Sequence, residues 1–189
     1  WSRIREMTFE RYEVPDGFRG TEETIRRMHE LTADAYKDPR VVALAREIVY
    51  AMPWKNYANE VSAILAWCQA NLRYVRDPVN VEHLQHPAVT IFETRSGDCD
   101  ELAPAFSALW AAVGNPWGFR TVGNDPMRPT HFVHVYSLVS LGGNWLPADP
   151  TFHSAPLGWE PPAADLSRLG VPQPNAVSSR RDWFPAKYE

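Results

Sequence analysis

One cysteine at the junction of a tight turn and an apolar segment constrains this chain most strongly. Gly97 permits a close backbone approach, and Asp98 is a residue type that caps helices. The backbone N–H groups of a first helical turn favour a thiolate over a thiol. Cys99 is therefore the candidate nucleophile. The alternative is a small buried core residue, which is the commoner state of a lone cysteine.

The residues after Cys99 repeat apolar side chains at helical spacing, and Gly114 is a typical stop signal. The pattern predicts a central helix between them. Pro104 removes one backbone hydrogen bond early in this helix, so we expect an irregular first turn or a local bend. The apolar stripe consists of Leu102, Ala103, Phe106, Leu109 and Trp110.

Capping and stop signals predict three more helices before the cysteine. The first begins at Thr21, where two acidic residues follow, and leaves residues 1–20 as an irregular arm. The second begins at Asp38, which precedes a proline, and ends before Pro53. The third covers residues 56–72.

The pattern changes from helical to extended after the central helix. Gly142 and Gly143 form a natural hairpin turn between two of the predicted strands. Residues 154–189 are rich in proline and have little periodicity, so we assign them no secondary structure and expect an extended tail. The strands are expected over residues 118–122, 131–141 and 144–148, with a short one at Tyr74-Val75.

These elements predict an α+β fold, with N-terminal helices packed on an antiparallel β-sheet. A chain of 189 residues suits one compact domain. We expect three parts within it: an N-terminal arm with helices over residues 1–55, a catalytic core over 56–153, and the Pro-rich tail over 154–189.

Composition excludes several functional classes. The net charge of −4 argues against a nucleic-acid-binding protein, which needs a clustered basic surface. The sequence has only two cysteines, Cys68 and Cys99. We therefore expect no disulfide scaffold, and we expect the protein to reside in a reducing compartment. Cys68 lies on the apolar stripe of its helix and is interpreted as core. The sequence has neither an apolar stretch long enough to span a membrane nor a signal-peptide pattern, which predicts a cytoplasmic or virion-associated protein.

The predicted hairpin supplies a partner for the cysteine. If Gly142 and Gly143 form a two-residue turn, paired residues have numbers that sum to 285, and Asp149 lies opposite Tyr136. Asp149 is then diagonal to His134 on the same face, within reach of its side chain. His131 points to the opposite face. His134 is therefore the candidate base, and Asp149 the residue that orients it.

Three motifs follow one another along the chain: Gly97-Asp98-Cys99, His134-Val135-Tyr136 and Trp145-Leu146-Pro147-Ala148-Asp149-Pro150. This order resembles the transglutaminase-like cysteine superfamily. More narrowly, small members encoded by phages and prophages are similar in Tyr74-Val75-Arg76-Asp77-Pro78, Asp98-Cys99-Asp100 and Phe132-Val133-His134-Val135-Tyr136. The resemblance extends over about residues 60–152. It implies a papain-like core, a thiolate–imidazolium pair of Cys99 with His134, and Asp149 as the third member.

The resemblance also implies a reaction through a thioester acyl-enzyme, which water or an amine resolves. The backbone N–H of Cys99 is the expected oxyanion donor, and we expect Gln85, Tyr136 and Trp145 to bind substrate or the oxyanion. The three acids beside Cys99 oppose thiolate formation. No calcium-binding loop of the EF-hand type is present, so we favour hydrolysis of peptide or isopeptide bonds, without a cofactor.

Two alternatives remain open. The chain could be a virion structural or assembly protein that docks on phage proteins through its arm and tail, with or without activity. It could instead bind a metal, although His131 and His134 oppose each other on a strand and no four-ligand spacing is evident. The residues considered for this metal site are Cys99, His131, His134 and His153.

Overall fold

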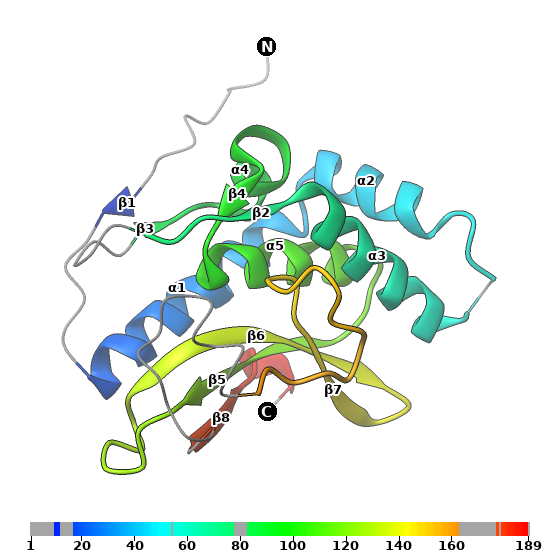
Figure 1. Cartoon of the computed structure of the whole chain (residues 1–189). Helices are drawn as coiled ribbons and strands as arrows, with labels where there is room; N and C mark the ends of the chain where they lie inside the picture. Colours follow the sequence, from blue (N-terminus) through cyan, green and yellow to red (C-terminus); the bar gives the residue numbers. More distant parts are fainter. Residues whose placement is uncertain are drawn as a thin grey trace.

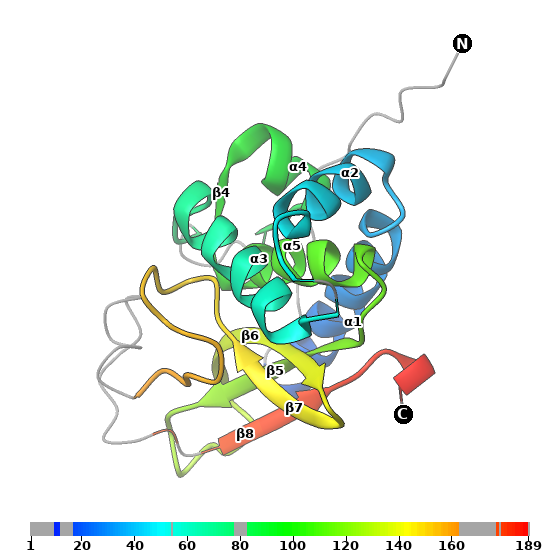
Figure 2. The same ribbon diagram turned by 90° about the vertical axis from the view of Figure 1, so that its right-hand side faces the viewer.

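The protein consists of a helical layer packed on one face of a β-sheet. The computed structural model describes residues 10–11, 17–53, 55–77, 83–162, 177 and 179–188. Helix α5 (Cys99–Ala112) lies at the centre of the helical layer and packs on the sheet, with the other helices around it (Figure 1). Figure 2 shows the same two layers from the side. The predicted α+β architecture is confirmed.

The helices before the cysteine follow their capping signals. Helix α2 (Pro39–Val49) begins where predicted, because the Asp38 side chain accepts a hydrogen bond from the Arg40 N–H at 2.8 Å. Helix α3 (Tyr57–Asn71) is capped by Asn56, whose side chain accepts from the Asn59 N–H at 3.2 Å. Both helices pack against α5, and their buried apolar residues are Val41 and Ala45 in α2 and Val61, Ile64, Leu65 and Cys68 in α3.

The start predicted for the first helix is wrong. Helix α1 (Phe18–Ala35) begins before Thr21, after Gly17, which has a positive φ of 73°. Glu23, expected in the first turn, instead accepts hydrogen bonds from Arg26 and Arg27 one turn later. Most of the predicted N-terminal arm, residues 1–9 and 12–16, lies outside the described residues.

Helix α5 continues as a helix through Pro104. The irregular first turn that we expected is not observed, and the Asp98 and Glu101 side chains form a reciprocal capping box there. Gly114 follows the helix with a φ of 92°, as expected of a residue that ends one.

The four-stranded sheet has the order β7-β6-β5-β8 and is antiparallel throughout. The turn at Gly142 and Gly143 has φ values of 59° and 84°, which only glycine adopts readily. The pairs Ser137↔Ala148 and Leu141↔Asn144 confirm the predicted register. The strands are β5 (Trp117–Gly123), β6 (Phe132–Leu141), β7 (Asn144–Ala148) and β8 (Ser179–Trp183).

Strand β8 corrects the expectation of a tail without secondary structure. It pairs with β5 at the edge of the sheet, with Arg120 opposite Asp182. Arg120 donates two hydrogen bonds to this carboxylate, at 2.6 and 2.7 Å, and Trp183 donates from Nε1 to Thr121 Oγ1. Polar cross-strand pairs hold this strand, and they leave no apolar alternation in the sequence. Residues 163–176 lie outside the described residues.

Several short strands and turns complete the fold. Strand β1 (Glu10–Arg11) pairs with β3 (His83–Leu84), and β2 (Arg73–Tyr74) pairs in parallel with β4 (Ser96–Gly97). Helix α4 (Pro87–Val89), capped by His86, continues as a π-helical turn over Thr90–Thr94. A 3₁₀ turn (Ala186–Tyr188) ends the described chain. Within the described residues, none of the helices combines the length and apolar character needed to cross a bilayer.

A largely buried histidine of α1 packs against the sheet. His29 lies against the rings of Trp117 and Phe119, at centroid distances of 5.4 and 5.1 Å. Burial lowers its pKa to about 4, although a hydrogen bond to the backbone of Trp183 works in the opposite direction. The neutral imidazole is therefore the form that the fold accommodates.

This burial predicts a specific acid sensitivity. Between pH 6.5 and about 4 the unfolded chain binds a proton at His29 that the folded chain does not, so stability falls as the pH is lowered through this window. We expect the wild type to lose about 2 to 3 kcal/mol more than His29→Gln between about pH 7.5 and pH 4.5, measured by urea unfolding. If both proteins lost the same stability over this pH range, the folded protein would not hold His29 as a neutral imidazole.

Candidate active site

Cys99 is the first residue of α5, as predicted. The Asp98 side chain accepts a hydrogen bond from the Asp100 N–H at 3.0 Å. In return, Glu101 Oε2 accepts from the Asp98 N–H at 2.7 Å. This reciprocal capping box fixes the backbone on both sides of the cysteine. The predicted capping role of Asp98 is confirmed.

The turn before the cysteine is built around the buried carboxylate of Glu101. A Cβ at Gly97 would lie 2.5 Å from Glu101 Oε2, so only glycine fits there. The parallel strand β2 holds the same turn, because Tyr74 pairs with Gly97 and the Val75 N–H donates to the Gly97 carbonyl at 2.8 Å. Glycine is therefore required at position 97 because the Glu101 side chain lies so close to it. Strand β2 and the Glu101 side chain together hold the turn in place.

His134 and Asp149 form a hydrogen-bonded pair with fully buried side chains. His134 Nε2 lies 2.8 Å from Asp149 Oδ2. The other carboxylate oxygen, Asp149 Oδ1, accepts from the Thr151 N–H at 2.9 Å. A carboxylate held in this way makes Nε2 the protonated nitrogen of a neutral imidazole. His134 Nδ1 is buried, and no described residue forms a hydrogen bond with it.

Aromatic rings enclose the imidazole. The Tyr136 ring lies 5.8 Å from the His134 ring on the same strand, and the Phe152 ring packs edge-on against His134, also at 5.8 Å. Trp159 in turn packs against Phe152 at 5.1 Å. The predicted shared face of His134, Tyr136 and Asp149 is thus observed. His131 is exposed just before β6 begins.

Two serines join the helix of the cysteine to the strand of the histidine. Ser137 Oγ donates to the Ala103 carbonyl at 2.9 Å, and Ser107 Oγ donates to Ser137 Oγ at 2.9 Å. Cys99 lies one turn before Ala103, and His134 lies three residues before Ser137. Figure 1 shows the first residues of α5 and of β6 toward the same side of the molecule. The cysteine and the histidine thus lie toward one end of the contact between α5 and β6.

Three carboxyl groups lie close together at the start of α5, those of Asp98, Asp100 and Glu101. Burial, and then the charge of Asp98, raise the pKa of Asp100 well above its ordinary value. Burial also raises the pKa of Tyr74, and the neighbouring Cys99 adds to this shift. The Tyr74 hydroxyl therefore stays protonated near the cysteine. Burial alone raises the pKa of the Cys68 thiol, as expected of a core residue.

The three further residues expected around substrate have different surroundings. Gln85 is buried, and its Nε2 donates to the Ser96 carbonyl at 3.3 Å, next to the nucleophile turn. The Tyr136 hydroxyl donates to Glu160 at 2.9 Å on the face of the sheet that carries His134. Trp145 packs against Phe184, with ring centroids 4.5 Å apart, in the C-terminal segment.

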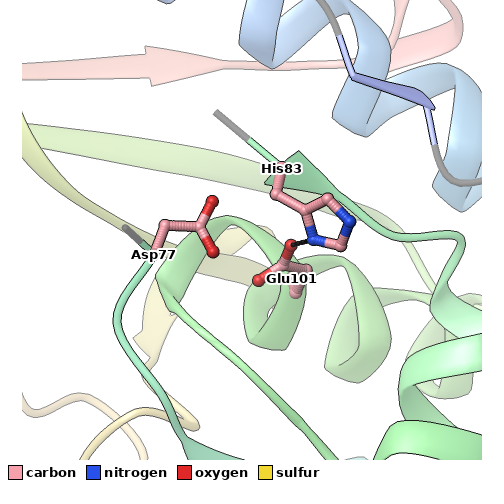
Figure 3. Close-up of side chains that lie close together, drawn as sticks. All are labelled: Asp77, His83 and Glu101. Carbon is pink, nitrogen blue, oxygen red and sulfur yellow. Dashed lines mark ion pairs between the residues drawn. The ribbon is translucent and has the colours of Figure 1, made fainter. Parts of the chain in front are cut away.

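Two groups of described side chains have ligand atoms close enough to share a metal ion. Figure 3 shows the first, in which Asp77 and His83 point toward Glu101, with 3.7 Å between His83 Nδ1 and Glu101 Oε1. This nitrogen and oxygen set suits zinc or manganese. The second consists of Asp98, Asp100 and Glu101, and carboxylates alone suit calcium or magnesium. Glu101 already serves the capping box, and we assign no metal to either group.

Sequence reasoning missed two residues beside the candidate site. Gln69 on α3 donates from Nε2 to three carbonyls of the segment that follows β7. Glu160 accepts from Tyr136 and from Arg120, which hold that segment against the sheet. The one available signal was a glutamine four residues after Leu65 on an apolar helical stripe.

The model of the transglutaminase-like superfamily matches residues 43–150, which is more than half of the chain. The chain belongs to this superfamily. No curated protein matches it. The match covers the turn before Cys99, strand β6 and strand β7, which leads to Asp149.

Two solved structures are similar. One is a protein named as a proposed cysteine protease of Cytophaga hutchinsonii, with 23% identity over 77% of this chain and 46% of that one, and a TM-score of 0.48. The other is named as a proposed protease of Parabacteroides distasonis, with 12% identity over 75% of this chain and 27% of that one, and a TM-score of 0.57. This chain spans less than half of either. The second likeness supports the fold alone.

The Gly97 contact predicts a coupled loss of stability and reactivity. In Gly97→Ala the new Cβ must displace the Glu101 carboxylate and break the capping box. We expect a loss of about 1 to 3 kcal/mol in urea unfolding and slower alkylation of Cys99.

Gly17→Ala is the matched control, because its positive φ causes strain without any neighbour within 4 Å. We expect it to lose about 1 kcal/mol while Cys99 reacts as in the wild type. If Gly97→Ala were as stable and as reactive as the wild type, the close contact between Gly97 and Glu101 would not be what holds the turn.

Proposed function

We propose that this protein is a cysteine hydrolase of amide bonds in peptides or proteins, with Cys99, His134 and Asp149 as its catalytic triad. The observation that carries the proposal is the buried imidazole whose Nε2 is held by Asp149 and whose Nδ1 has no described protein partner. A general base needs one nitrogen fixed and the other available for the nucleophile. Cys99 at the start of the neighbouring α5 supplies a suitable nucleophile.

In the resting protein, His134 Nδ1 has already taken the proton of the Cys99 thiol, which gives a thiolate–imidazolium pair. In the first half of the reaction, the thiolate attacks the amide carbonyl carbon and forms the new C–S bond. The negative charge on the carbonyl oxygen is stabilised by the backbone N–H of Cys99 at the helix start. His134 then protonates the departing nitrogen, the C–N bond breaks, and a thioester remains on the enzyme.

In the second half, His134 removes a proton from water, and the hydroxyl attacks the thioester carbonyl. The C–S bond breaks, the carboxylic acid leaves, and the thiolate of Cys99 is restored beside the imidazolium of His134. Asp149 holds the imidazole in one tautomer and stabilises the imidazolium through Nε2. The Thr151 N–H keeps the carboxylate oriented toward the ring.

Hydrolysis is proposed over cross-linking because the sequence contains no calcium-binding loop of the EF-hand type. The substrate is a peptide or protein, and Gln85 beside the nucleophile turn is the proposed second oxyanion group. Association with phage structural proteins and a role in the virion stay predictions from the sequence, as does the absence of a nucleic-acid or membrane partner.

Alkylation of Cys99 across pH tests the proposed triad without knowledge of the substrate. Cys68 is fully buried, so iodoacetamide reports on Cys99 in the folded protein. We expect the wild type to react at least about tenfold faster near pH 7 than His134→Ala, and Asp149→Asn to fall between them. Labelling is followed by mass spectrometry.

His131→Ala is the control, because this exposed histidine lies just outside β6. It should react as the wild type does. A Cys99 that behaves as an ordinary thiol in every variant would overturn the proposal. A large loss in His131→Ala would overturn the choice of base.

A further inference from the structure

We propose that Gln69 is a positioning residue for Asp149, and that it holds the third member of the triad from the opposite layer of the protein. The inference rests on the proposed function. Gln69 lies in α3, on the helical layer, whereas Asp149 directly follows a strand of the sheet. Its side chain is the link between them.

One amide group bonds three backbone carbonyls at regular spacing. Gln69 Nε2 lies 2.7 Å from the Phe152 carbonyl, 2.9 Å from the Ala155 carbonyl and 3.3 Å from the Asp149 carbonyl. An amide nitrogen has two hydrogens, so the two shorter bonds are direct and the longest one is shared. The residue is buried, which makes each of these bonds costly to lose.

The backbone of the same residue provides a second tie. His153 Nδ1 lies 2.5 Å from the Gln69 carbonyl. This carbonyl lies in the last turn of α3, where carbonyls lack a partner within the helix. The segment from Asp149 to Ala155 is therefore fixed to one helical position at four points.

The fixed carbonyls belong to the residues that shape the histidine site. The Asp149 side chain bonds His134, and the Phe152 ring covers the imidazole. If the segment shifted by about 1 Å, the Asp149 to His134 contact would lengthen beyond good hydrogen-bond geometry. Gln69 thus acts on the reaction through Asp149 and Phe152, without touching substrate.

The test compares Gln69→Met with Asn71→Ala. Methionine keeps the length of the side chain and removes both donors. Asn71 is exposed in the same helix, and its amide donates to the nearby Trp67 carbonyl within that helix. Circular dichroism establishes that each variant is folded before Cys99 is alkylated across pH.

We expect Gln69→Met to react about three- to tenfold more slowly near pH 7, with the profile displaced toward that of Asp149→Asn. Asn71→Ala should react as the wild type. Gln69→Asn keeps the amide but shortens its reach, so we expect it to slow alkylation less than Gln69→Met does. It replaces Gln69→Met in the test if the methionine variant does not fold.

The outcomes separate the two proposals. If His134→Ala slows alkylation but folded Gln69 variants react normally, the positioning role is overturned and the triad stands. If His134→Ala has no effect, the triad itself fails. Failure of both Gln69 variants to fold would also overturn the inference, because Gln69 would then determine the fold rather than the placement of Asp149.

Discussion

The buried hydrogen bond between His134 and Asp149 is the interaction on which the surrounding structure depends. Both side chains are completely inaccessible, and such a pair is costly unless its geometry is good and its other polar atoms are satisfied. The β6–β7 register brings the two residues together, the Thr151 N–H satisfies the second carboxylate oxygen, and Gln69 fixes the backbone that follows. One atom, His134 Nδ1, is left without a described partner.

The turn before Cys99 is also built around a buried carboxylate, that of Glu101. Glu101 is fully buried at the start of α5, where it accepts from the Asp98 N–H and lies near His83. The neighbouring carboxyl groups oppose a thiolate at Cys99, while burial and the charge of Asp98 raise the pKa of Asp100 well above its ordinary value. The match to the transglutaminase-like superfamily, over residues 43–150, spans both halves of the candidate site.

Much of this arrangement was predictable because its signals are local. Gly142 and Gly143 set a turn whose register follows by counting, and Asp98 caps the helix that carries Cys99. Strand β8 was not predictable, because charge pairs such as Arg120 with Asp182 hold it and leave no apolar alternation. The start of α1 and the role of Gln69 depend on distant packing, which a single sequence does not record.

The most direct test of the central claim is the protonation of the His134 ring, observed by nitrogen NMR on histidine-labelled protein. With Cys99 replaced by alanine, the account predicts a neutral imidazole with its proton on Nε2, bonded to Asp149, and none on Nδ1. In the wild type at neutral pH it predicts protons on both nitrogens, paired with the thiolate. A proton on Nδ1 in the alanine variant, or identical spectra for the His134 ring in both proteins, would contradict the account.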